Sequence, residues 1–182
     1  MAKEDLEKVE REFNEETRGD FKELLNKEAA KLTPEELERK ALRFLDRYVV
    51  GTLATCSDGI PRSTPVRYRN DGFTVYVLTE GGGKLHNIQK NSNVSFSIFG
   101  NYSGIQSVRG LQMWGKAEIF SPKDEDIYTE AFELMKLSER EDLKKAGVPD
   151  IQLGMFIIKI NTERAKYLSF PEGILNEEIA FV

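Results

Sequence analysis

The sequence has few of the residues on which disulfide and metal sites depend. Its 182 residues include one cysteine, Cys56, and one histidine, His86. A lone cysteine cannot form an internal disulfide framework, and one cysteine with one histidine cannot make a structural zinc site of the usual ligand type. The serine-rich and aspartate-rich segments have no histidine at the spacing of a nucleophile, which argues against a hydrolase triad.

Long apolar runs are also missing. No apolar segment of the kind found in signal peptides follows Met1, and no uncharged stretch is long enough to span a bilayer. We therefore expect a cytoplasmic protein with no membrane association. Internal repeats and low-complexity segments are not found either, and the length predicts one main domain.

Net positive charge is absent outside the middle of the chain. Residues 1–48 carry 11 basic and 14 acidic side chains, residues 49–120 carry 7 and 4, and residues 121–182 carry 8 and 13. The middle third is therefore positive in a chain whose net charge is −5. This local excess fits a small anionic ligand, whereas nucleic-acid binding would require a larger basic surface.

The chain begins with a charge-rich segment, residues 1–32, which we interpret as a helical N-terminal extension. Thr33-Pro34-Glu35-Glu36 is a capping box with proline at the first helical position, and it predicts a helix. Apolar residues then follow at helical spacing on one face of that helix. They are Leu37, Ala41, Phe44, Leu45 and Tyr48.

From Val49 the apolar period changes from 3.6 to 2, which predicts strands. We expect strands at residues 49–56, 62–69, 73–78, 93–99, 108–120 and 155–160, and a short strand or tail at 167–170. Tight turns at 57–59 and 70–72 indicate that the first three form an antiparallel meander. Helices are predicted at 85–89, after Ser121-Pro122, and at 138–146.

These elements predict a mainly β (α+β) fold: a six-stranded antiparallel split β-barrel with flanking helices. Closing the sheet would remove most of its exposed edges. We assign residues 33–170 to this barrel and residues 171–182 to a C-terminal tail.

The segment Thr79-Glu80-Gly81-Gly82-Gly83-Lys84, here called the glycine loop, connects a predicted strand to a predicted helix. Glycines let backbone N–H groups turn toward a ligand, and the helix that follows contributes unpaired N–H groups and the positive end of its dipole. Lys84 adds a full charge. The loop therefore predicts a phosphate site. Because it follows the third strand of a meander rather than lying in a βαβ unit, neither a P-loop nor a Rossmann site is indicated.

The order of these motifs resembles the pyridoxamine 5'-phosphate oxidase-like FMN-binding split-barrel family. The resemblance covers residues 49–120 well and 121–170 loosely. It is carried by five segments: 51–55, 58–67, 78–79 with 84–88, 91–95 and 115–118. It implies a homodimer with FMN at the subunit interface and redox chemistry on a small molecule, with no nucleic-acid or membrane partner.

The resemblance also implies a set of cofactor-binding residues. The second strand would run beside the flavin, with Arg62 or Arg67 helping to neutralise the phosphate, and Thr79 and Lys84 would bind near the phosphate. The full set is Arg62, Ser63, Thr64, Pro65, Val66, Arg67, Thr79 and Lys84. Relatives often have an arginine immediately before the lysine, where this chain has Gly83. The substrate-binding tryptophan and arginine of the oxidase itself have no counterpart in residues 174–182.

Several alternatives stay open at this point. Arg62 and Arg67 are an odd number of residues apart, so a regular strand would point them to opposite faces. His86 fits a surface or packing role better than that of a general base, and Trp114 could contact the ligand, the core or a second subunit. Catalytic residues are not identified. The same fold could bind deazaflavin or haem, or could serve as a flavin-binding sensor or carrier.

Overall fold

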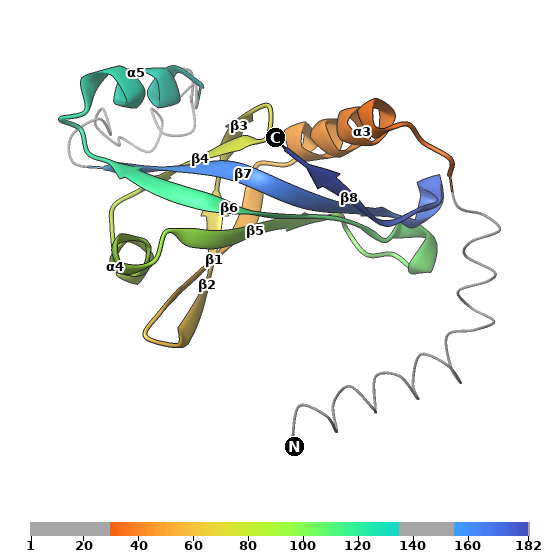
Figure 1. Ribbon diagram of the computed structural model, residues 1–182, viewed down its shortest axis with the longest axis horizontal. Helices are drawn as coiled ribbons and strands as arrows, with labels where there is room; N and C mark the ends of the chain where they lie inside the picture. The colour runs from red at the N-terminus through yellow and green to blue at the C-terminus, as the bar shows by residue number, and fades with distance from the viewer. Residues whose placement is uncertain (1–29, 135–154, 182) are drawn as a thin grey trace.

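The computed structural model describes residues 30–134 and 155–181 (Figure 1). The predicted helix at 138–146 and nearly all of the predicted N-terminal extension lie outside these residues. The elements, in chain order, are α3 (Pro34–Arg47), β1 (Val50–Ser57), β2 (Ile60–Arg67), β3 (Arg69–Asp71), β4 (Thr74–Thr79), α4 (Gly83–Lys90), β5 (Asn93–Phe99), η1 (Ile105–Ser107), β6 (Arg109–Phe120), α5 (Glu125–Leu134), β7 (Phe156–Ser169), η3 (Phe170–Glu172) and β8 (Ile174–Ala180).

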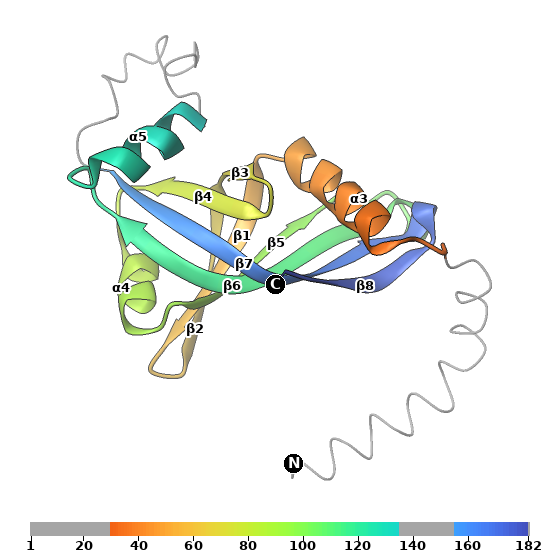
Figure 2. The same cartoon turned by 45° about the horizontal axis from the view of Figure 1, so that its top comes forward.

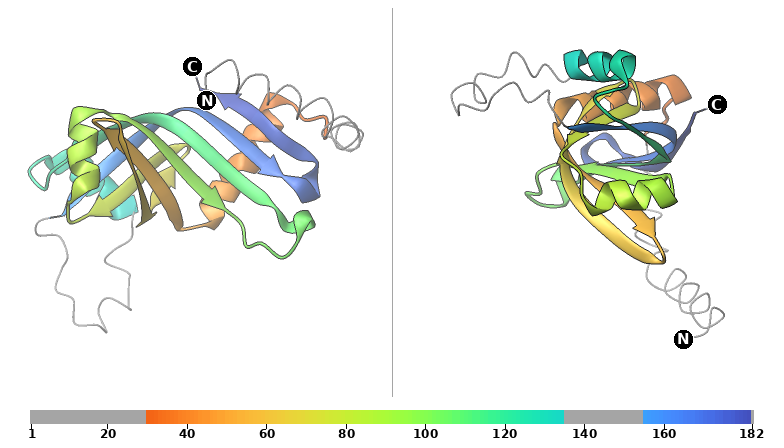
Figure 3. Two further views of the ribbon diagram at one scale, coloured as in Figure 1. Left: turned by 90° about the horizontal axis from the view of Figure 1, so that it is seen from below. Right: turned by 90° about the vertical axis from the view of Figure 1, so that its left-hand side faces the viewer.

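The strands form one antiparallel sheet in the order β2-β1-β5-β6-β7-β4-β3, with β8 also paired to β7. The sheet curls (Figure 3). As a result β2 and β4, far apart in this order, line a common cavity. Helices α3 and α4 lie at opposite ends of the curled sheet, and α5 lies beside β4 and β7 (Figures 1 and 2). The predicted mainly β antiparallel split barrel with flanking helices is confirmed.

The strand count is a correction to the prediction. The sheet has eight strands rather than six. One addition is β3, which is three residues long and too short to show an alternating pattern. The other is β8, which lies in the segment expected to be a tail and pairs with the second half of β7. The predicted strands at 155–160 and 167–170 are parts of the single long strand β7.

The predicted meander is correct for its first hairpin and wrong for its third strand. β1 pairs with β2 around Asp58 and Gly59, both of which have a positive φ suited to a tight turn. β4, however, pairs with β3 and β7 rather than with β2. The chain leaves β2 at Tyr68, which is buried and lies between the end of β2 and the start of β3. Alternation shows that a segment is a strand but does not show which strand is its partner.

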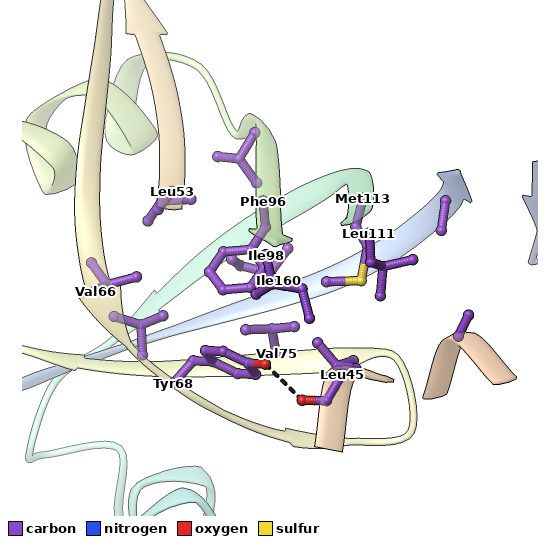
Figure 4. Packing of buried hydrophobic residues seen from close by; sticks show 14 of the residues in the cluster. Leu45, Leu53, Val66, Tyr68, Val75, Phe96, Ile98, Leu111, Met113 and Ile160 are labelled. Carbon is purple, nitrogen blue, oxygen red and sulfur yellow. Dashed lines mark hydrogen bonds between the residues drawn. The ribbon is translucent and has the colours of Figure 1, made fainter. Parts of the chain in front are cut away.

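The core lies inside the curl and is closed by α3. The capping box at Thr33 forms as predicted, with the Thr33 hydroxyl accepting from the Glu36 N–H. The apolar face of α3 buries Phe44 and Leu45 against the sheet. Within this core the Tyr68 hydroxyl donates a 2.6 Å hydrogen bond to the Leu45 carbonyl (Figure 4). The side chain therefore joins helix and sheet at the point where the chain leaves β2.

A polar network connects α3, the end of β7 and η3. The Glu172 carboxylate accepts hydrogen bonds from Lys40 Nζ at 2.6 Å, from the Ser169 hydroxyl at 2.8 Å and from the Tyr167 hydroxyl at 3.1 Å. Burial raises the pKa of Glu172, but the hydrogen bonds and the Lys40 charge outweigh it, so that the pKa lies below its ordinary value. We call α3, η3 and β8 the closed end.

No helix in the described residues is both long enough and apolar enough to cross a membrane.

Candidate functional site

The opposite end of the molecule, formed by β2, β4, the glycine loop and α4, is here called the open end. In the described part of the chain β2 has a strand neighbour on one side, β1. Its other edge faces β4 and the glycine loop across a cavity. An edge strand leaves backbone N–H and C=O groups available to a ligand. This is the position that the sequence predicted for a phosphate-bearing molecule.

The glycine loop has a backbone that most residues could not adopt. Gly81 and Gly82 have φ values of 133° and 93°, in the region that favours glycine. Gly82 is the N-cap residue of α4, and no side chain caps this helix start. The unpaired N–H groups and the positive end of the helix dipole are therefore available to an anion.

Thr79 and Lys84 are both tied to the backbone of this loop. The buried Thr79 hydroxyl accepts a 3.3 Å hydrogen bond from the Gly81 N–H, and Lys84 Nζ donates a 2.8 Å bond to the Gly81 carbonyl. Burial lowers the pKa of Lys84, and the nearby positive charge of Arg62 lowers it further. The negative charge of Glu80 raises the pKa, but by less than these two effects lower it. Two cations held close to each other favour an anion between them.

Side chains on β1 hold α4 in place behind the loop. The Asn87 amide, which is buried, donates to the Thr55 hydroxyl at 3.1 Å and accepts from the Ser57 hydroxyl at 2.8 Å. Leu85 and Ile88 bury the apolar side of the helix in the core. The position of Lys84 is thus set by a helix anchored through both apolar and polar contacts.

The first of two cavities at the open end has a volume of about 380 Å³. Six of the predicted cofactor-binding residues line it: Thr64, Pro65, Val66, Arg67, Thr79 and Lys84. Leu78, Glu80, Gly81 and Met155 complete the lining. The volume lies within the range of about 300–1,000 Å³ that is typical of small-molecule sites.

The second cavity has a volume of about 450 Å³ and contains the other two predicted residues, Arg62 and Ser63. It extends along the first half of β2 to the hairpin turn, and His86 and Asn87 of α4 form its opposite side. Each half of β2 therefore lines a different cavity. Residues up to Ser63 line the second, and residues from Thr64 onward line the first.

Arg62 extends from β2 to the start of α4. Its guanidinium lies so close to Gly83 that a Cβ atom at position 83 would come within 2.7 Å of it. The guanidinium thus occupies the space that a side chain at position 83 would need. The resemblance describes an arginine immediately before the lysine, and in this chain an arginine of β2 takes that place beside Gly83.

Sequence reasoning named the glycine loop, and with it the backbone of Gly81, but did not include Met155. Met155 comes from the far end of the chain, and only the fold brings it to β2, so no local signal could have indicated it. Trp114 lies under the Arg164 guanidinium, 4.2 Å from it, and lines neither cavity.

Comparison with known proteins gives a family match. The family model described as pyridoxamine 5'-phosphate oxidase matches residues 37–167. General stress protein 26 of Bacillus subtilis (strain 168) is 30% identical over 89 residues, which are 48% of this chain and 63% of that protein. The chain therefore spans less than two thirds of the length of this curated relative.

Solved structures show the same fold. A structure described as a putative pyridoxamine 5'-phosphate oxidase from Listeria innocua is 24% identical, has a TM-score of 0.57, and the match covers 73% of this chain and 98% of that one. A FAD-binding protein from Mesorhizobium loti (18% identity, TM-score 0.55) matches over 70% and 90% of the two chains. A heme-binding protein from Mycobacterium smegmatis (16%, 0.59) matches over 85% and 60%.

The family match begins within α3, ends near the end of β7, and includes the residues of β2, the glycine loop and α4 that line the two cavities. The fold and the matched segment agree with each other, and the chain belongs to the pyridoxamine 5'-phosphate oxidase family.

Proposed function

We propose that this protein is an FMN-binding flavoprotein with oxidoreductase activity toward a small molecule. One observation carries the proposal: the second half of β2 lines the first cavity together with Thr79, Gly81 and Lys84 of the glycine loop. An uncapped helix start, two glycines at positive φ and a lysine form a cradle suited to a phosphate. The residues present therefore fit the cofactor that the family resemblance implies.

Each group has a separate task in this proposal. Lys84 and the first N–H groups of α4 hold the phosphate, with Arg62 adding a second positive charge from β2. The backbone edge of β2 between Thr64 and Arg67 lies along the flavin ring, and Thr79 fixes the shape of the loop. When bound, the flavin supplies the hydride or electron chemistry, and the protein supplies binding, orientation and tuning. No side chain of the site is required to act as an acid or base for a hydride transfer.

The test is the visible spectrum of the purified protein together with a titration with added FMN. The proposal predicts flavin absorbance, or saturable binding of FMN when the protein is isolated without it. A colourless protein that binds no FMN would show that the proposal is wrong. Mass spectrometry of the extracted ligand separates FMN from a deazaflavin or a haem.

Turnover separates an enzyme from a flavin-binding sensor or carrier. Reduced nicotinamide with an acceptor should be consumed steadily by an enzyme. A bound flavin that is never re-reduced would favour the sensor or carrier. In either case the first cavity holds the flavin, so the binding test and the turnover test address different parts of the proposal.

We also propose that two copies of the chain associate around the cofactor. Exposed apolar side chains support this, because Phe99 and Tyr102 are 72% and 77% exposed. Val50 is another exposed apolar residue. β1 and β5 are antiparallel and pair Thr52 with Ser97, so the same register places Val50 opposite Phe99. Burying such a patch is a common reason for association. Sedimentation of the native chain and of Phe99→Asp tests it: a dimer that becomes a monomer is expected.

A further inference from the structure

The second cavity lies beyond the phosphate end of the proposed flavin site. It is lined by Ile60 to Ser63, the half of β2 that does not line the first cavity. β2 is eight residues long, which corresponds to about 26 Å at roughly 3.3 Å per residue. A ligand lying along β2 could therefore extend from Arg67 to Ile60.

The lining of the second cavity has the chemistry of a nucleotide site. Arg62 lies between the two cavities, against Gly83, and forms no ion pair with any described residue. His86 and Ser63 provide further polar groups. The carboxylate of Asp58, the acid in this lining, is paired with Lys90 at 2.7 Å, so its charge is largely neutralised.

The same cavity also offers apolar surface that the fold does not use. Ile60 is 69% exposed on the hairpin, next to Pro61, and both residues line the cavity. A large exposed apolar side chain beside a cationic groove is suited to the face of a base, since bases combine a flat apolar surface with an attached phosphate.

We propose that the second cavity binds the adenylate portion of a flavin dinucleotide, with Arg62 between the two phosphates and the adenine over Ile60 and Pro61. The inference rests on the proposed function, because it takes the flavin phosphate to lie at Lys84. It adds that the site accepts a group esterified to the flavin phosphate, and that the protein binds FAD at least as tightly as FMN.

The experiment measures the dissociation constants of FMN and FAD, by quenching of flavin fluorescence, for the full chain freed of bound flavin. The variants are His86→Ala and Ile60→Ser, both at exposed positions in the second cavity. Each should weaken FAD by about 3- to 10-fold and FMN by less than about 2-fold. Gln89→Ala is the matched control, since Gln89 is exposed on α4 and does not line the cavity, and it should change neither constant.

The outcomes separate the two claims. Binding of FMN with FAD more than about tenfold weaker would overturn the inference and leave the proposed function standing. Equal effects of the two variants on FMN and FAD, or no effect on either, would also overturn it. Binding of neither flavin would mean that the proposed function is wrong, and the inference with it.

Discussion

The closed end and the open end of this molecule use lysine in opposite ways. At the closed end Lys40 is paired at 2.6 Å with Glu172, whose carboxylate also accepts from two hydroxyls. At the open end Lys84 is held at 2.8 Å by a backbone carbonyl, and among the described residues it has no ion pair with an acid. A carboxylate neutralises a lysine, whereas a carbonyl positions it and leaves its charge available. One end thus uses its lysine in a network within the fold, and the other leaves a lysine charge available to the ligand that we propose.

The largest effect is expected from Phe44→Ala at the closed end. Phe44 is buried and its ring contacts those of Tyr48 and Tyr167. Its removal should lower the free energy of unfolding by about 3–5 kcal/mol, because it leaves a cavity in the core. Denaturant unfolding measures the loss. Flavin affinity, measured where the variant is still folded, should stay at the native value, and a large loss of affinity would show that the two ends are not independent.

Lys84→Ala should weaken flavin binding without lowering the stability of the protein. We expect flavin affinity to fall by about 1–3 kcal/mol, the range of a charge-assisted hydrogen bond. The unfolding free energy of the ligand-free protein should not fall, since the lysine satisfies no acid. Flavin titration and denaturant unfolding together test both parts. Lys166→Ala, on β7 and outside the lining of both cavities, is the control and should leave affinity unchanged.

Glu172→Gln examines the network of the closed end and its pH dependence. The exchange should cost about 1–2 kcal/mol of stability at neutral pH, because it weakens hydrogen bonds to a charged group. The folded-state pKa of Glu172 lies below the ordinary value of 4.5. Its contribution is therefore complete above that value and is lost as the pH falls through the lower folded pKa. Unfolding curves at several pH values should show the difference between native protein and variant shrinking below pH 4.5, and a constant difference would contradict this.

The smallest effect is expected from Asp58→Asn. Asp58 pairs with Lys90 at the surface, where hydrogen bonding and the charge of Lys90 lower the pKa of the carboxyl. Exposed pairs of this kind stabilise proteins little, and asparagine tolerates the positive φ of 52° at this turn. No resolvable shift of the unfolding midpoint is expected. A clear loss would indicate that the hairpin depends on this pair more than its exposure suggests.

The sequence predicted those features that depend on neighbouring residues. The capping box at Thr33, the turn at Asp58-Gly59 and strand β5 all follow from local rules, and all are found in the structure. The glycine loop before Lys84 was recognised for the same reason. Such features depend on a few adjacent residues and their backbone preferences.

Other features depend on residues far apart in the chain and could not be predicted in this way. β8 is an example, because its partner on β7 decides that it is a strand. The contact between Arg62 and Gly83 is another, since strand alternation describes the faces of β2 and does not show which helix start the fold brings beside it. Alternation alone therefore could not tell how Arg62 and Arg67 would be divided between two cavities.

The exposed edge of β2 has a consequence for the ligand-free protein. In the described residues this edge has no strand beside it, and such an edge is a template for pairing with another chain and for aggregation. A flavin lying along β2 would cover the same backbone groups. The cofactor would then prevent this self-association. The yield of unaggregated protein should therefore rise when cells or refolding mixtures are supplied with flavin.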